Sequence, residues 1–141
     1  MHECKRLLSF DFVVLIFVIL FAFCNMAVFY SFYGYLARIG IAPEWRGFLV
    51  GLEPMSAFLL RLSVIPFLHM ANAAGAMLLA LIMLVMALCS YSFAETIPAI
   101  AILRIFHGAA FVLLISAAMT LVVCFIPRER AAQGFGIVSL A

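Results

Sequence analysis

The chain has 141 residues, of which 70% are hydrophobic and only 10% are charged, and its mean hydropathy is +1.33. Soluble domains are about 45–50% apolar, so this composition excludes a water-soluble globular domain and predicts a lipid bilayer as the surroundings. The net charge is +2 with no basic cluster, which excludes nucleic acid as an expected partner. The four cysteines form no C-x-x-C pair, so we expect buried, apolar thiols without disulfides or zinc.

The first apolar run follows a polar lead at residues 1–11 and predicts a transmembrane helix over about 12–36. It is longer than the apolar core of a signal peptide, which has about 7–15 residues. Asn25 is its only amide, and Tyr30 and Tyr33 lie toward its end. These three side chains are candidates for hydrogen bonding to a solute. The alternative is an interhelical bond for Asn25 and membrane-interface anchoring for the tyrosines.

The second predicted helix, at about 47–68, is the most polar of the set because it carries Glu53 and Arg61. A charge at the centre of a membrane helix costs about 2.5–3.5 kcal/mol on the insertion scale. We therefore expect both charges to face protein or a watery cavity instead of lipid. The spacing of Gly47 and Gly51 predicts a face on which another helix could approach closely.

The third and fourth helices are predicted at about 76–93 and 98–126. The third has no charged residue, so we expect it to face lipid, away from any cavity. The fourth carries Arg104, with His107 and Gly108 three and four residues further along the same helical face. An arginine inside a membrane span is uncommon, which makes Arg104 a candidate functional residue.

Four spans place Lys5 and Arg6 on the same side of the membrane as Arg128 and Arg130. Positively charged segments stay in the cytoplasm, so we expect both of these segments there. The polar lead is then cytoplasmic, and the expected location is a bacterial-type inner (plasma) membrane.

Glu53 and Arg104 share a depth in this topology. Each lies about 12 Å below the outer interface, counted at about 1.5 Å per residue from Trp45 and Thr96 respectively. Opposite charges at one level in a medium of low dielectric favour pairing. We therefore predict a Glu53–Arg104 interaction, acting either as a fixed structural brace or through a carboxyl group that exchanges a proton.

Three stretches near the end of the chain form a recognisable pattern: Arg104-x-x-x-Gly108, Ile126-Pro127-Arg128-Glu129-Arg130, and Gln133-Gly134-Phe135-Gly136. This pattern resembles the Major Facilitator Superfamily of secondary transporters. The resemblance implies an all-α integral membrane fold with four transmembrane helices and the start of a fifth at about 131–141, like the N-terminal part of a six-helix half. Its first and fourth helices would line the cavity. The chain departs from the family's loop motif, because Asn72 and Ala73 stand in place of an aspartate and an arginine if Gly75 sets the register. If Arg61 sets the register instead, His69 stands there, and in either case the acid and the basic cluster are missing.

The function that the resemblance implies is secondary active transport of a small-molecule solute by alternating access, with proton coupling left open. Expected substrate or coupling residues are Asn25, Tyr30, Tyr33, Glu53, Arg104 and His107. Expected structural or gating residues are Gly47, Gly51, Arg61, Gly108, Pro127, Arg128, Glu129 and Arg130. We expect no cofactor, no metal and no enzymatic activity, because no catalytic or phosphate-binding motif occurs.

Transporters of this family have two six-helix halves, so we expect the chain to be a fragment that works with the remaining helices or as a homo-oligomer. Two alternatives remain open. One is a small four-helix transporter that works as a dimer and uses Glu53. The other is a membrane protein of assembly or anchoring, in which Glu53, Arg61 and Arg104 serve only as contacts.

Overall fold

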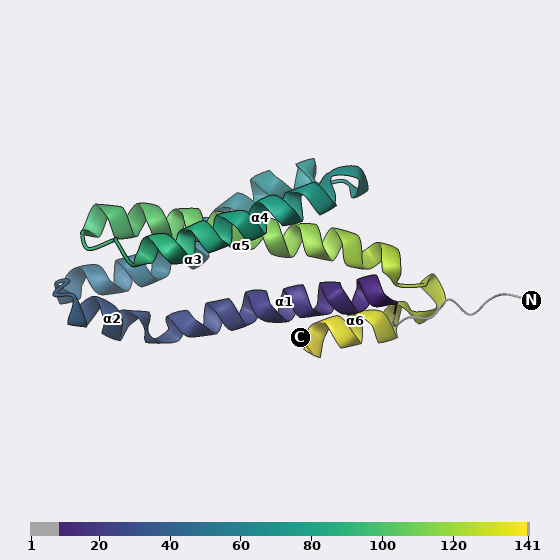
Figure 1. Ribbon diagram of the computed structural model, residues 1–141, viewed down its shortest axis with the longest axis horizontal. Coiled ribbons are helices and arrows are strands. Elements are labelled where there is room, and N and C mark those ends of the chain that lie inside the picture. The colour runs from purple at the N-terminus through teal and green to yellow at the C-terminus, as the bar shows by residue number, and fades with distance from the viewer. Residues whose placement is uncertain (1–8, 141) are drawn as a thin grey trace, which may run out of the picture.

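The computed structural model describes residues 9–140, and 89% of the chain is helical, with no strand among the described residues (Figure 1). The predicted cytoplasmic lead, with Lys5 and Arg6, lies for the most part outside the described residues. Within the described residues, four helical segments are long and apolar enough to cross a membrane. The predicted all-α membrane fold is therefore confirmed.

The helices follow one another with short connections. They are α1 (Phe10–Val28), a 3-10 turn (Phe29–Ser31), α2 (Phe32–Arg38), α3 (Pro43–Val64), α4 (Met70–Tyr91), α5 (Ile97–Phe125) and α6 (Ala131–Leu140). Helices α1 and α2 together make the first span. The start of α1, the α3–α4 connection and the α5–α6 connection lie at one end of the bundle, as an antiparallel arrangement of four spans requires (Figure 1).

Two helices begin several residues earlier than predicted, and local chemistry explains both starts. Helix α3 begins at Pro43, where the missing N–H of proline is tolerated in a first turn. Helix α4 begins at Met70, so the predicted start near residue 76 is wrong. The Asn72 side chain accepts a hydrogen bond of 2.8 Å from the backbone N–H of His69, and this cap starts the helix in the stretch between the second and third predicted helices.

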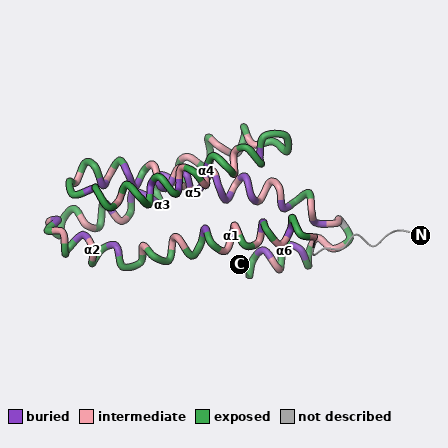
Figure 2. Tube along the Cα trace, viewed as in Figure 1, coloured by how far each residue is buried: buried purple, intermediate pink, exposed green. Residues whose placement is uncertain are grey.

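Helix α5 is the central element of the packing. It packs along much of α3 and α4 and more sparsely against α1. Buried positions are concentrated along it (Figure 2), where alanines such as Ala110, Ala117 and Ala118 let neighbouring helices come close. Helix α4 buries its own small residues, Ala80 and Ala87, against this core and turns larger apolar side chains outward.

The outer surface is apolar, as a bilayer requires. Cys24, Cys89 and Cys124 are free and lie on this surface. The prediction that the cysteines are buried is therefore wrong for these three. In a lipid environment an apolar side chain gains nothing from being inside the protein instead of facing the acyl chains, so hydrophobicity alone does not predict burial here.

Candidate functional site

An ion pair links α3 to α5 inside the bundle. Arg104 Nη2 lies 3.3 Å from Glu53 Oε2, and each of the two residues is only 2% exposed. The predicted pairing of Glu53 with Arg104 is thus confirmed as a contact. Its role in transport stays a prediction.

Arg104 also donates hydrogen bonds to the main chain of α3. Its Nε lies 3.2 Å from the Leu49 carbonyl oxygen, and its Nη2 lies 2.9 Å from that of Val50. Pro54 lies inside α3 and has no N–H, so the carbonyl four residues earlier, that of Val50, lacks its usual helical donor. The arginine supplies that donor. Pro54, Glu53 and Arg104 therefore form one structural unit.

A second polar cluster joins α1, α4 and α5. Asn25 Nδ2 lies 2.9 Å from His107 Nε2, and the Tyr91 hydroxyl lies 3.4 Å from His107 Nδ1. With the Asn25 amide as donor, Nε2 is the acceptor and the ring proton of His107 lies on Nδ1, facing the tyrosine. His107 is 0% exposed, so these two contacts are its polar surroundings within the described residues.

Aromatic rings connect the two clusters. The Arg104 guanidinium carbon lies 5.2 Å from the ring centre of Phe29 and 4.8 Å from that of Phe32. The ring centre of Phe29 also lies 4.8 Å from that of His107. A cation over an aromatic face is attracted by the ring quadrupole, most strongly where water is excluded. The 3-10 turn between α1 and α2 thus places Phe29 between Arg104 and His107.

Gly108 is a point of close approach between α3 and α5. A Cβ atom on this glycine would collide with the Ser56 hydroxyl and with the Glu53 carbonyl oxygen. Ser56 in turn donates a hydrogen bond of 2.8 Å to that carbonyl oxygen. The spacing Arg104-x-x-x-Gly108 therefore has a physical reason: the glycine lets α3 come close enough for the arginine to reach Glu53.

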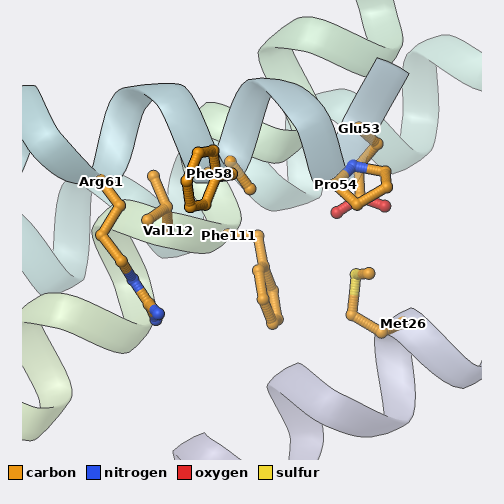
Figure 3. A pocket seen from close by; sticks show the side chains of 8 residues that line it. Met26, Glu53, Pro54, Phe58, Arg61, Phe111 and Val112 are labelled. Carbon is orange, nitrogen blue, oxygen red and sulfur yellow. The ribbon is translucent and has the colours of Figure 1, made fainter. Parts of the chain in front are cut away.

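A cavity of about 240 Å³ opens between α1, α3 and α5 (Figure 3). Its lining residues are Met26, Glu53, Pro54, Ala57, Phe58, Arg61, Phe111 and Val112. In the close view, Glu53 and Arg61 lie at opposite ends of the cavity, with Phe58 and Phe111 between them. A second cavity of about 380 Å³ continues past Arg61 and is lined by Ser116 and Thr120 among apolar residues. We call the two cavities together the groove.

Several predicted site residues lie elsewhere. Tyr30 is 88% exposed and Tyr33 is 48% exposed, and neither lines the groove. Tyr33 instead lies near Arg46, whose guanidinium carbon is 5.8 Å from the tyrosine ring centre. The predicted close-approach face at Gly47 and Gly51 is wrong, since a Cβ on either would meet nothing within 4 Å.

The segment after α5 is a turn that starts α6. Pro127 follows the end of α5, and the Pro127 carbonyl accepts a 2.9 Å hydrogen bond from the Arg130 N–H. The Arg130 side chain donates to Gln133 Oε1 at 2.9 Å, and Glu129 is exposed. The side chain of Arg128, another predicted gating residue, lies outside the described part. Among the described residues, no group of three or more His, Cys, Asp or Glu comes together to hold a metal.

Tyr91, Ser56, Phe58 and Phe111 belong to the site and were not predicted. Tyr91 could have been found, because it is a polar tyrosine at the end of a third span that has no charged residue. Phe58 and Phe111 carry no signal in a chain with 15 phenylalanines. Comparison of the chain with models of known protein families, with curated proteins and with solved structures finds no match.

Proposed function

We propose that this chain forms part of a secondary transporter resembling the Major Facilitator Superfamily, in which a small solute crosses the membrane by alternating access. The observation that carries the proposal is the groove. A nearly fully buried carboxylate, Glu53, and a cation, Arg61, line one cavity of about 240 Å³ inside the apolar spans. Ionisable side chains at membrane depth are rare and costly, and those that line a cavity mark solute or ion pathways.

The groove lies along one side of the bundle and is open there, so a complete pathway needs a second wall. Further helices, from the same transporter or from a second copy of the chain, would supply it. In this arrangement Arg104 on α5 holds the Glu53 carboxylate, and Glu53 is one of the residues that line the groove. Glu53 is then the residue that would exchange a proton if transport is coupled to protons.

The positive-inside rule sets the orientation that we propose. The end of the bundle with the α5–α6 turn, which carries Arg130, faces the cytoplasm, and Trp45 lies at the outer interface. The groove then runs from Glu53 in the outer half toward Arg61 and Thr120 in the inner half. The proposed location is an inner membrane of the bacterial type.

Cysteine labelling tests whether the groove is an aqueous pathway. In a chain with its native cysteines replaced, Ala57→Cys places a thiol in the groove, and Leu59→Cys places one on the exposed outer face of the same helix. A charged methanethiosulfonate reagent should label the first thiol and spare the second, because the reagent needs water. Alternating access predicts labelling of Ala57→Cys from each side of the membrane, in right-side-out and in inside-out vesicles.

A thiol at position 57 that resists the reagent from both sides would contradict the proposal. The groove would then be a packing defect filled by lipid or by another helix, as a non-transporting assembly protein would have. Labelling from one side alone would indicate a static pocket instead of a transport pathway.

A further inference from the structure

Arg61 is a cation without a protein partner in the described part of the chain. Three other arginines each donate a side-chain hydrogen bond to a protein acceptor: Arg46, Arg104 and Arg130. Among the described residues, Arg61 makes no such bond and has no carboxylate within ion-pair distance. Its side chain is exposed and extends away from α3 into the groove (Figure 3). The guanidinium donors can therefore contact a ligand.

A second donor, the Ser116 hydroxyl, lies in the cavity of about 380 Å³, which we call the inner cavity. A serine or threonine hydroxyl in a helix often donates to the carbonyl four residues earlier, as Thr120 does to the Ser116 carbonyl at 2.8 Å. Within the described residues, Ser116 Oγ itself makes no hydrogen bond. Arg61 is the one ionisable group that lines the inner cavity in this part of the chain. A guanidinium and a hydroxyl without a carboxylate beside them favour an anion.

The other surfaces beside these two donors are apolar. The inner cavity is further lined by Leu68, Ile115, Met119 and Val123. Phe58, three residues before Arg61 on the same face of α3, is 67% exposed. A small inorganic anion would contact the two donors and leave these apolar surfaces uncovered. An amphiphile with an anionic group and an apolar chain would contact both kinds of surface.

The two donors also lie near a membrane surface. Arg61 lies about 24 Å from Trp45 along α3, and Ser116 lies about 30 Å from Thr96 along α5, at about 1.5 Å per residue. The hydrocarbon core is about 30 Å thick, so both donors lie within about 6 Å of its far boundary when Trp45 and Thr96 mark the near one. Long arginine side chains at this depth reach the interface, where the phosphates of the lipids lie.

We infer that the inner cavity is a binding site for one anionic phospholipid. Its phosphate accepts hydrogen bonds from Arg61 and Ser116, and an acyl chain runs from there over Phe58 toward the centre of the bilayer. The planar guanidinium can donate to two phosphate oxygens at once. A zwitterionic phospholipid also brings an ammonium group, and no carboxylate lines the inner cavity within the described residues to accept it. The site goes beyond the proposed function, because it would exist in a protein that transports nothing.

The test is native mass spectrometry of the purified full chain in detergent, with equal amounts of phosphatidylglycerol and phosphatidylcholine that carry the same acyl chains. The wild type should retain one phosphatidylglycerol in preference to phosphatidylcholine by about tenfold or more, as a charge-assisted contact provides. An excess of glycerophosphoglycerol, the same headgroup without acyl chains, should leave the bound lipid in place. No retained lipid, equal retention of the two lipids, or displacement by the soluble headgroup overturns the inference.

Variants assign the contacts of the phosphate. Arg61→Gln should reduce the preference for phosphatidylglycerol by about tenfold or more, and Ser116→Ala by about two- to tenfold. Arg38→Gln and Ser63→Ala are matched controls, because both residues are exposed and neither lines the groove. Neither Arg61 nor Ser116 is buried, so we expect both variants to fold. An Arg61→Gln variant that keeps the preference, as Arg38→Gln should, refutes the site.

Lipid binding and transport fail separately in these experiments. Two-sided labelling of Ala57→Cys without an Arg61-dependent lipid preference refutes the inference and keeps the proposed function. An Arg61-dependent preference for phosphatidylglycerol in a chain whose position 57 is closed to the thiol reagent refutes the proposed function and keeps the lipid site.

Discussion

Exchanging the side chains of Glu53 and Arg104 should leave the bundle less stable than the wild type. A simple ion pair would tolerate the exchange, but Arg104 also donates to the carbonyl oxygens of Leu49 and Val50. In the Glu53→Arg/Arg104→Glu variant, a carboxylate at position 104 would face these two acceptors. The Val50 carbonyl would also lose its donor, because Pro54 supplies no N–H to replace it.

The loss of unfolding free energy in each variant depends on which buried polar groups are left without a partner. Arg104→Gln strands the buried Glu53 carboxylate, a change that costs about 3–5 kcal/mol. Glu53→Gln leaves Arg104 with two carbonyl acceptors and the Phe29 and Phe32 rings, so we expect about 1–3 kcal/mol. The exchanged variant should lose about as much unfolding free energy as Arg104→Gln. At about 4 °C per kcal/mol for a chain of this size, Arg104→Gln melts about 12–20 °C below the wild type.

Thermal unfolding followed by circular dichroism in one detergent measures these differences. Wild type, Glu53→Gln, Arg104→Gln and the exchanged variant are compared at the same protein concentration. The double neutral variant Glu53→Gln/Arg104→Gln completes the cycle and gives the coupling between the two residues. An exchanged variant that melts within about 2 °C of the wild type would show that the main-chain bonds of Arg104 contribute little. Equal losses of stability in Glu53→Gln and Arg104→Gln would refute the prediction that losing Arg104 costs more than losing Glu53.

Two further predictions concern the packing around this pair. Gly108→Ala should destabilise the bundle by about 1–3 kcal/mol, because its Cβ collides with Ser56 and the Glu53 carbonyl. Gly51→Ala, with open space around it, should be neutral or stabilising by about 0.5–1 kcal/mol. Equal melting temperatures for the two variants would mean that α3 and α5 do not meet at Gly108. A double-mutant cycle of Asn25→Leu and His107→Phe should give a coupling energy of about 0.6–1.7 kcal/mol, the range of interhelical hydrogen bonds in membranes. If the two losses of stability simply add in the same unfolding assay, the Asn25–His107 contact is not made.

The shared level of Glu53 and Arg104 along the bundle was predictable from the sequence. Apolar runs of sufficient length indicate spans, and the rise per residue places Glu53 and Arg104 at the same level. Because a charge in lipid is costly, equal depth was enough to predict their contact. The all-α class and the four spans follow from the same reasoning, and the structure agrees with both.

The rotation of each helix about its axis was not predictable in the same way. The spacing of Gly47 and Gly51 is the same as that of a close-approach pair, yet neither faces a neighbouring helix, whereas Gly108 does. Tyr30 and Tyr33 follow Asn25 along one span, yet only Asn25 reaches His107. In a chain that is apolar on every side, hydrophobicity does not mark an inner face, so side-chain packing decides the rotation.

The sequence by itself therefore determined which segments are apolar enough to cross a membrane and that Glu53 and Arg104 share one level, because a bilayer acts on every residue through its polarity. The tertiary structure alone decided which side chains meet: the Arg104 bonds to the carbonyls of α3, the Asn25–His107–Tyr91 cluster, and the groove with Glu53 and Arg61 at its ends. These contacts depend on how four helices pack together, and small residues such as Gly108 allow that packing without any signal in hydropathy.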